Sequence, residues 1–479
     1  MSSIKTNLIY NIIYQMLAIV LPLITTPYVS RVLGADGVGI YSYTYTVANY
    51  FMLVAMLGVK NHGNRSIAAV REDPRKLSRT FWEIYGLQAI CSAIALVAYI
   101  AYALLVEPEH RLIFLIQGIY VLTGMLDISW LFFGLEKFKL TVGRNIAMKL
   151  LTLVCIFLFV RSKDDLWVYT LILVLGTFFS QSYLWLYVKK EVRWHRPSLS
   201  RLLCHLKPEL ILFIPVIAVS LYKMMDKVML RLMSDYAQVG FYESSEKILN
   251  IPAGLITALG TVMLPRMANL AAKGMTKLSR QYIRDSMVFA MFLSCGMAFG
   301  IAGIADVLVP MFLGEEFLPC MGLLKVLAPT VMMISWGNVL RTQFLIPQHR
   351  DRSYIFSVSL GAVVNLIANA LLIPHLSAMG AAIGTLLAEL AVCVSQTVLV
   401  RRDLPVDRYL RVCLPMLIPG ILMYVLLELI CPLFPSPTVA TVLGVVIGGT
   451  VYVLLCGIYL SLCMPALLSR YLAKIIRRK

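Results

Sequence analysis

The chain has 479 residues, of which 59% are apolar and only 14% are charged. Soluble domains carry about 25% charged residues, so this composition excludes both a water-soluble globule and a disordered chain. Lys and Arg outnumber Asp and Glu by 43 to 25, an excess that in a membrane protein is typical of cytoplasmic loops.

Long apolar stretches predict an all-α polytopic membrane protein with about fourteen transmembrane helices, because each crossing takes about 20 apolar residues. The connections are too short to fold as a separate catalytic domain. The ten cysteines and six histidines show no ligand-like spacing, so we expect no metal and no cofactor. The predicted spans have the approximate limits 8–30, 38–59, 82–105, 111–134, 140–160, 166–188, 208–233, 239–264, 286–309, 320–345, 353–373, 378–400, 410–431 and 438–463.

The basic residues are distributed unevenly between the two ends of these spans. With the N-terminus inside, 32 Lys and Arg residues fall on the cytoplasmic side, and five fall on the outer side. The positive-inside rule therefore predicts that both termini are cytoplasmic and that the number of spans is even.

A repeat of about 201 residues relates two halves of the chain. Lys76-Leu77-Ser78-Arg79 reappears as Lys277-Leu278-Ser279-Arg280, and Val38-Gly39-Ile40-Tyr41 reappears as Val239-Gly240-Phe241-Tyr242. The offset relates span 2 to span 8, which predicts two parallel six-helix lobes around a central cavity, as in alternating-access transporters. The predicted organisation is an N-terminal lobe over 1–190, a cytoplasmic linker over 191–207, a C-terminal lobe over 208–402, and two further spans with a basic tail over 403–479.

Charged residues within spans 7 and 8 are the main candidates for a substrate-binding site. Lys223 and Lys227 lie four residues apart and share one helix face, and Asp226 is spaced to pair with Lys223. Glu243 and Lys247 form a second pair with helical spacing. Because ionisable side chains at membrane depth usually face a cavity, we interpret this face as cationic and substrate-binding. The alternative is an ion-pair network that only ties the two helices together. The predicted set is Lys223, Asp226, Lys227, Glu243, Glu246 and Lys247.

Span 2 carries a polar face of a different kind. Tyr41, Tyr45 and Asn49 follow one another at helical spacing, so their side chains share one side of the helix. Aromatic and amide groups suit the ring faces and hydroxyls of sugars. Ordinary helix packing with a hydrogen-bonded Asn49 is the alternative.

Two further charged residues within spans are candidates for the same cavity. Asp127 in span 4 has no basic neighbour on its own helix face, so it either serves the cavity or pairs with a neighbouring helix, for example with Lys149 of span 5. Arg341 in span 10 either lines the inner mouth of the cavity or extends to the cytoplasmic surface.

Four segments resemble the Wzx-type polysaccharide flippases, within the multidrug/oligosaccharidyl-lipid/polysaccharide exporter superfamily. They are Pro27–Gly34, Gly37–Tyr41, Asp127–Phe138 and Val262–Arg266. The resemblance covers nearly the whole chain and implies export of an undecaprenyl-pyrophosphate-linked oligosaccharide across the bacterial plasma membrane, without covalent chemistry. The implied partners are this substrate, membrane lipids and a polysaccharide polymerase, with no nucleic acid. A cationic cavity suits the anionic pyrophosphate.

Two other function classes compete with this interpretation. A cation-coupled multidrug antiporter of the same superfamily would need net acidic cavity residues, whereas span 7 is net positive. A membrane glycosyltransferase or polymerase would be expected to carry a soluble domain or a large outer loop, and the predicted outer loops are short.

Overall fold

The computed structural model describes residues 4–106 and 108–463, and this part of the chain is helical without a β-strand. Contacts divide the chain into unit 1, Met1–Arg231 with Asp235–Gly240, and unit 2, Leu232–Ser234 with Phe241–Lys479. The predicted basic tail after residue 463 lies outside the described residues. The lobe boundaries predicted from the repeat stay a prediction. The predicted C-terminal lobe begins at residue 208, whereas the division by contacts places the chain up to Arg231 in unit 1.

Unit 1 begins with one long helix that contains a sharp change of direction. Helix α1, Ile4–Met56, is interrupted at Gly34, where φ is 69° and ψ is −179°. This backbone conformation is essentially restricted to glycine, so a single residue joins predicted spans 1 and 2. The other elements that begin in unit 1 are α2 (Val59–Val70), α3 (Pro74–Leu105), α4 (Arg111–Leu126), α5 (Ser129–Gly134), α6 (Phe138–Phe159), η1 (Lys163–Asp165), α7 (Leu166–Glu191), α8 (Leu199–Met233) and the first turn of α9 (Tyr236–Ala272).

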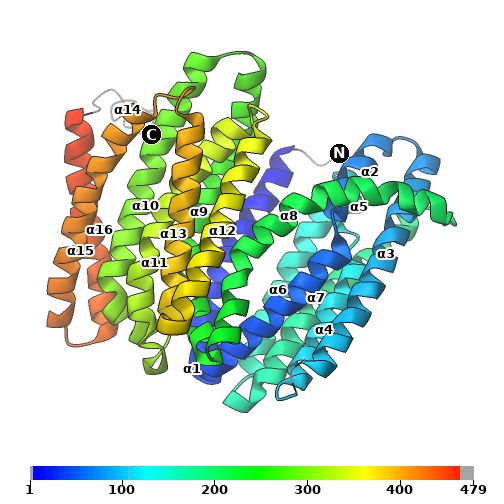
Figure 1. Cartoon of the computed structure of the whole chain (residues 1–479), viewed down its shortest axis with the longest axis horizontal. Coiled ribbons are helices and arrows are strands. Elements are labelled where there is room, and N and C mark those ends of the chain that lie inside the picture. Colours follow the sequence, from blue (N-terminus) through cyan, green and yellow to red (C-terminus); the bar gives the residue numbers. More distant parts are fainter. Residues whose placement is uncertain (1–3, 107, 464–479) are drawn as a thin grey trace. The chain divides into compact units, whose positions relative to one another are not determined.

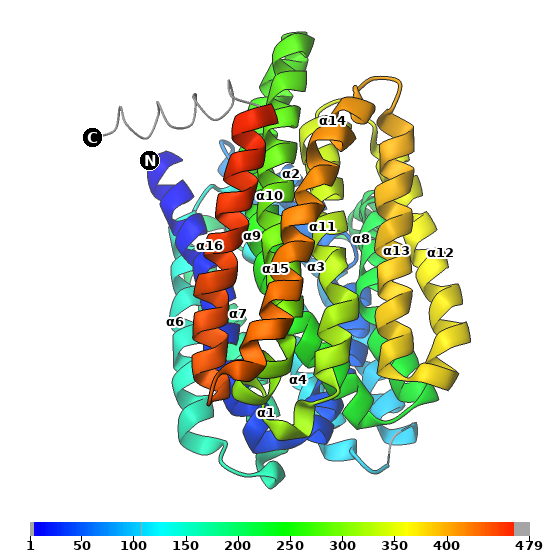
Figure 2. The ribbon, with the colours of Figure 1, turned by 90° about the vertical axis from the view of Figure 1, so that its left-hand side faces the viewer.

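Unit 2 is built from the rest of α9 and a second group of long helices. Helix α10 packs against α11, α15 and α16, while α13 packs against both α11 and α12 (Figure 2). The ammonium group of Lys325 on α11 lies 2.8 Å from carboxylate oxygens of Asp306 on α10 and Glu428 on α15, which ties these three helices together. The elements are α10 (Thr276–Phe312), η2 (Glu315–Phe317), α11 (Cys320–Leu340), η3 (Arg341–Leu345), α12 (Asp351–Leu376), α13 (Ala378–Val400), α14 (Val406–Cys413), η4 (Leu414–Met416), α15 (Leu417–Ile430), η5 (Cys431–Leu433) and α16 (Pro437–Cys463).

Eleven helical segments in the described part of the chain are long and apolar enough to cross a membrane. They coincide with predicted spans 3–6 and 8–14. The two arms of α1 coincide with predicted spans 1 and 2, and α8 coincides with predicted span 7. The predicted all-α membrane fold with about fourteen spans is therefore confirmed.

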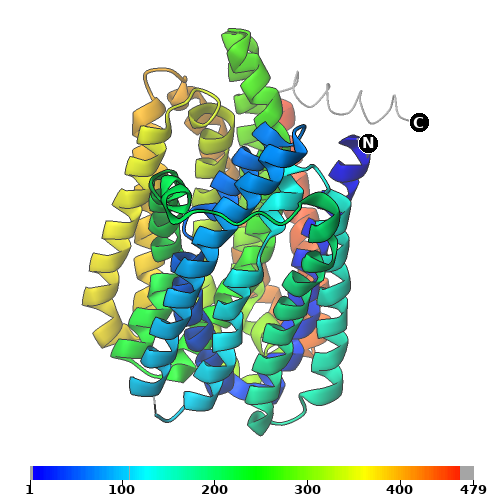
Figure 3. The ribbon, with the colours of Figure 1, turned by 90° about the vertical axis from the view of Figure 1, so that its right-hand side faces the viewer.

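Three segments differ locally from the predicted spans. Predicted span 4 is not one helix, because it breaks at Asp127 and Ile128 between α4 and α5. The segment predicted as a linker is helical from Leu199 on, and the first part of α8 lies across the ends of other helices of unit 1 (Figures 1 and 3). Predicted span 10 ends in a π-helical turn that begins at Arg341.

Glycines allow the short helices α2 and α5 to pack closely in unit 1. A Cβ atom on Gly63 would lie 2.5 Å from the indole of Trp130, and one on Gly134 would lie 2.6 Å from Ile67. Trp130 and Ile67 are fully buried in a core cluster that also contains Phe81. This packing holds α5 in place directly after the break in the helix at Asp127.

Candidate functional site

The polar face predicted on span 2 is half-buried in unit 1 and continues onto neighbouring helices. The rings of Tyr41 and Tyr45 stack with centroids 5.9 Å apart, and Tyr41 meets the edge of Tyr169 on α7 at 4.9 Å. Tyr45 contacts Tyr120 on α4 at 5.2 Å, and the Tyr120 hydroxyl donates to Asn49 Oδ1 at 2.9 Å. We call these five residues the tyrosine chain. The predicted common face of Tyr41, Tyr45 and Asn49 on span 2 is confirmed, and the assignment to substrate binding stays a prediction.

A cavity of about 460 Å³ lies beside one end of the tyrosine chain, between α1, α6 and α7. Tyr169 forms part of its wall, together with Lys149 and several hydroxyl and amide side chains. The volume falls within the range of about 300–1,000 Å³ that is usual for small-molecule sites. The lining residues that carry polar groups are Thr25, Asn145, Lys149, Thr152, Tyr169, Thr177, Ser180 and Gln181.

The buried guanidinium of Arg144 holds two amides of this cavity in place. It donates to Asn145 Oδ1 at 3.0 and 3.2 Å and to Gln181 Oε1 at 3.2 Å. Ser180 also donates to Asn145 Oδ1, at 3.1 Å. Because the Asn145 carbonyl oxygen already accepts three hydrogen bonds, the amino group is the part of this amide that a ligand in the cavity would meet.

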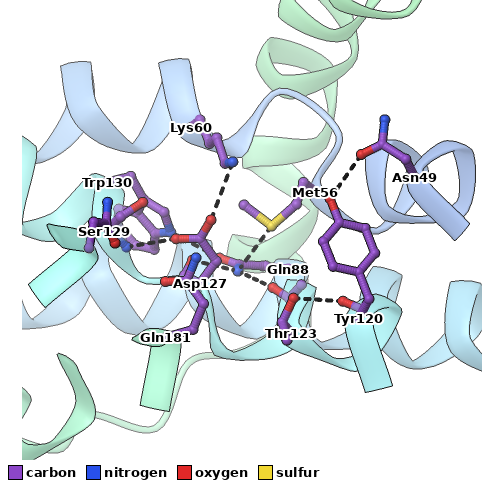
Figure 4. A network of polar contacts seen from close by, with 12 residues as sticks. Asn49, Met56, Lys60, Gln88, Tyr120, Thr123, Asp127, Ser129, Trp130 and Gln181 are labelled. Atoms are coloured by element: carbon purple, nitrogen blue, oxygen red, sulfur yellow. Dashed lines mark hydrogen bonds and ion pairs between the residues drawn. The ribbon is translucent and has the colours of Figure 1, made fainter. Parts of the chain in front are cut away.

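Asp127 lies at the break between α4 and α5, and its carboxylate has two partners (Figure 4). The side chain is 2% exposed. One oxygen lies 3.3 Å from the ammonium group of Lys60 on α2, and the other accepts the Ser129 N–H at 3.1 Å. The suggested pairing with Lys149 is wrong, because α2 brings Lys60 to Asp127 while Lys149 lines the cavity.

Side chains from two other helices bind backbone carbonyls at the break. The Gln88 amino group donates to the carbonyls of Gly124 at 2.6 Å and of Asp127 at 2.9 Å. The Trp185 indole donates to the carbonyl of Leu126 at 3.0 Å. The Trp130 indole in turn donates to Gln88 Oε1 at 3.0 Å, so the amide is fixed at both ends (Figure 4). Sequence reasoning missed Gln88 because hydropathy alone does not show which polar side chain donates hydrogen bonds to the backbone carbonyls at a helix break.

The charged stretch of α8 lies against the second arm of α1. Asn49 Nδ2 donates to the sulfur of Met224 at 3.1 Å, and Tyr50 lies within electrostatic reach of Asp226 and Lys227. Asp226 is buried, Lys227 is half-buried and Lys223 is exposed. The structure thus brings predicted spans 2 and 7 together in unit 1. A contact between their predicted site residues, and the pairing of Asp226 with Lys223, stay predictions.

The remaining predicted site residues belong to unit 2. The predicted pair of Lys247 and Glu243 on α9 is confirmed at 3.1 Å, and Glu246 is half-buried on the same helix. Arg341 donates to Asn338 Oδ1 at 2.8 Å and lies 5.8 Å from the ring of Tyr354. Arg341 therefore has partners within its own unit. A common cavity that unites these residues with Lys223 stays a prediction.

Comparisons with known proteins agree with this description. Residues 4–271 match a family described as polysaccharide biosynthesis protein. A putative O-antigen transporter of Escherichia coli (strain K12) is 24% identical over 418 residues, which cover 84% of this chain and 97% of that protein. A putative O-antigen transporter of Shigella dysenteriae is 23% identical over 376 residues, covering 78% and 93%.

Solved structures show the same fold. A lipid II flippase, MurJ, in an inward closed conformation has a TM-score of 0.78 at 11% identity, and the match covers 96% of this chain and all of that one. An inward-facing multidrug resistance MATE family transporter has a TM-score of 0.57 at 14% identity, covering 85% and 95%. Since the family match extends over more than half of its residues, the chain belongs to the polysaccharide biosynthesis protein family.

Proposed function

We propose that the protein is a flippase that moves an undecaprenyl-pyrophosphate-linked oligosaccharide across the plasma membrane by alternating access, for cell-surface polysaccharide biosynthesis. Family membership and the O-antigen transporters that match along most of their length support this function. The observation that carries it is a half-buried polar face of unit 1, on which the tyrosine chain adjoins the charged stretch of α8 among membrane-spanning helices. Polar groups at this depth mark substrate pathways.

The charged residues of α8 are assigned to the pyrophosphate. Lys223 and Lys227 bind its oxygens, and Asp226 orients Lys223, because charge-assisted hydrogen bonds offset the cost of drawing an anion into the membrane. Glu243, Glu246, Lys247 and Arg341 are assigned to substrate binding within unit 2. The alternative is a cation-coupled drug antiporter, because a multidrug transporter has the same fold. The two lysines of α8 argue against it, since an antiporter of this kind would need net acidic cavity residues.

The cavity beside Tyr169 and the tyrosine chain are assigned to the sugars. Amide and hydroxyl groups there match the hydrogen-bonding pattern of a glycan, and tyrosine rings present flat faces to sugar C–H groups. The protein performs no covalent chemistry. The exported glycan would be used by a polysaccharide polymerase on the outer side.

The orientation proposed for the chain places both termini in the cytoplasm of a bacterial cell, in the inner membrane. The bias of Lys and Arg supports this orientation. Reporter fusions after Arg75, Lys190 and Arg280 should all report the cytoplasm, and one outer signal among them would contradict the topology.

The pyrophosphate assignment is tested by Lys223→Gln combined with Lys227→Gln. Export should fall about 100-fold or more, because charged hydrogen bonds contribute about 1.5–3 kcal/mol each. The measurement is lipid-linked oligosaccharide accumulated in the inner leaflet, normalised to the membrane abundance of each variant. Lys189→Gln with Lys190→Gln, two exposed positions at the end of α7, is the matched control and should export normally. Wild-type export by a well-inserted Lys223/Lys227 variant would overturn the assignment.

The glycan assignment is tested by filling the cavity. Gly176→Leu places a side chain into the cavity, where even a Cβ would lie 2.5 Å from the Thr152 hydroxyl. Export should fall strongly, while Gly143→Leu on α6, with nothing within 4 Å of its Cβ position, should export normally. Equal export by two equally abundant variants would remove the cavity from the pathway.

A further inference from the structure

Two histidines from different helices form a direct hydrogen bond in unit 1, outside the site described above. Nε2 of His62 on α2 lies 2.8 Å from Nδ1 of His205 on α8. The residues are 143 positions apart in the chain. A hydrogen bond between two imidazoles requires that one nitrogen carries the proton and the other accepts it. The contact therefore exists only while at least one of the two rings is neutral.

A carboxylate from a third helix faces the same pair. The second ring nitrogen of His205 lies 3.5 Å from Glu83 Oε2 on α3. Glu83 is buried, and its other oxygen accepts from Arg79 Nε at 2.9 Å and lies 3.5 Å from Arg201 on α8. Helices α2, α3 and α8 thus meet at a cluster of titratable and charged side chains.

The same face of α8 carries a further buried acid one turn later. Glu209 has no exposed surface, and neither carboxyl oxygen has a hydrogen-bond partner among the described residues. Cys91 on α3 lies within electrostatic reach of it. An isolated buried carboxylate is costly, so the arrangement suits the neutral carboxyl. The backbone here is tightly packed, since a Cβ on Gly58 would lie 2.3 Å from the Glu209 carbonyl oxygen.

We propose that His62, His205 and Glu83 form a proton-binding site that holds the first part of α8 against α2 and α3, and that uptake of a second proton by the histidine pair releases it. Glu209 lies beside this site on α8 and holds its own proton there.

The two protons have opposite effects on the contact. The first leaves the bond with one donor and one acceptor, and the Glu83 carboxylate lies 3.5 Å from the outer nitrogen of His205. The second binds Nε2 of His62, removes the only acceptor of the bond, and leaves two cations 2.8 Å apart. Arg79 and Arg201 add further positive charge against this second proton.

The direction of the pH dependence follows from His62, which lies in α2 outside the predicted spans. Burial, and then the neighbouring His205, lower the pKa of His62. A lowered pKa in the packed state means that the contact is fully stable above the ordinary histidine value of about 6.5 and weakens as pH falls below it.

Release at this end bears on substrate binding because α8 is one continuous helix. The residues that follow on it include Asp226 and Lys227, which approach the second arm of α1. Proton uptake at the histidine pair would shift the helix that presents these charges. The inference concerns the motion of α8 and holds whether or not the transported molecule is a lipid-linked glycan.

Hydrogen exchange of the full-length protein in lipid nanodiscs tests the proposal without any substrate. Backbone protection of the segment 199–212 is compared at pH 7.5 and pH 5.5, after correction for the intrinsic pH dependence of exchange. One histidine whose pKa is about 6.5 in the released state and lower in the packed state reduces protection at pH 5.5 by up to about tenfold. Unchanged protection of the wild-type segment would overturn the proposal.

Variants identify the groups responsible. His62→Gln with His205→Gln keeps an uncharged hydrogen bond and should abolish the pH response. The matched control is His110→Gln, which alters a histidine that contacts Tyr236 instead, and it should keep the tenfold response. A tenfold response that persists in the double glutamine variant would also overturn the proposal. A wild-type protein that shows the exchange response but does not export lipid-linked oligosaccharide would contradict the flippase function and leave the proton site standing.

Discussion

Replacing Gly39 with alanine tests the tightest backbone contact in unit 1. A Cβ on Gly39 would lie 1.8 Å from the carbonyl oxygen of Tyr236, and a Cβ on Gly240 would lie 2.1 Å from that of Ala35. Carbon atoms of this kind do not approach within 3.0 Å, so α1 and the first turn of α9 must separate by roughly 1.2 Å. Both obstacles are backbone atoms, and no side-chain rotation relieves them. We expect Gly39→Ala to lower the free energy of unfolding by about 1–3 kcal/mol.

The control makes the same chemical change where there is space. Gly143 on α6 has nothing within 4 Å of its Cβ position, so Gly143→Ala should raise stability by up to about 1 kcal/mol, because alanine favours the helix. Thermal unfolding of both variants in the same detergent gives the comparison. A Gly39→Ala protein as stable as Gly143→Ala would refute the reasoning. Gly240→Ala should behave like Gly39→Ala, since the two glycines occupy equivalent positions of the 201-residue repeat.

Three further substitutions probe other features by thermal unfolding. Gly34→Ala should cost about 1–3 kcal/mol, because alanine does not adopt the backbone conformation at this turn. Gln88→Leu should cost more than Gly34→Ala, since it leaves two buried carbonyls and the Trp130 indole without partners, at about 1–3 kcal/mol each. Lys325→Met should destabilise the protein at neutral pH, because it leaves the like charges of Asp306 and Glu428 without the ammonium group between them. Adding Glu428→Gln to this variant should restore part of the lost stability. Independent effects of the two changes on stability would contradict this account.

Hydropathy predicted the number and position of the spans well, because each crossing needs a long apolar run whatever its neighbours are. The break in predicted span 4 has only a local signal, in which Asp127 accepts the N–H of Ser129 as an aspartate does at a turn. An average over 20 apolar residues conceals that signal. The residues that make the break stable, Gln88 and Trp185, lie 39 and 58 positions from Asp127 and cannot be assigned to it from spacing.

In the candidate site, too, the sequence predicted relations within one helix but not contacts between helices. Helical spacing was enough to place Tyr41, Tyr45 and Asn49 on one face, because that relation is local. Their partners Tyr120 and Tyr169 come from other helices, and only the packing of those helices reveals them. Lys60 was missed for a different reason. The bias of charges assigns it to a cytoplasmic loop, whereas α2 carries its ammonium group back to the buried Asp127.

The break between α4 and α5 also has a mechanical meaning. An interrupted membrane helix is often regarded as a hinge, yet a hinge needs backbone groups that exchange partners cheaply as it bends. Here the carbonyls of Gly124, Leu126 and Asp127 each accept a hydrogen bond from a side chain of another helix. Bending at this point would break several of these bonds at once and would leave buried carbonyls without partners. The interruption is therefore a rigid joint, and the flexing that transport requires falls to other parts of the chain.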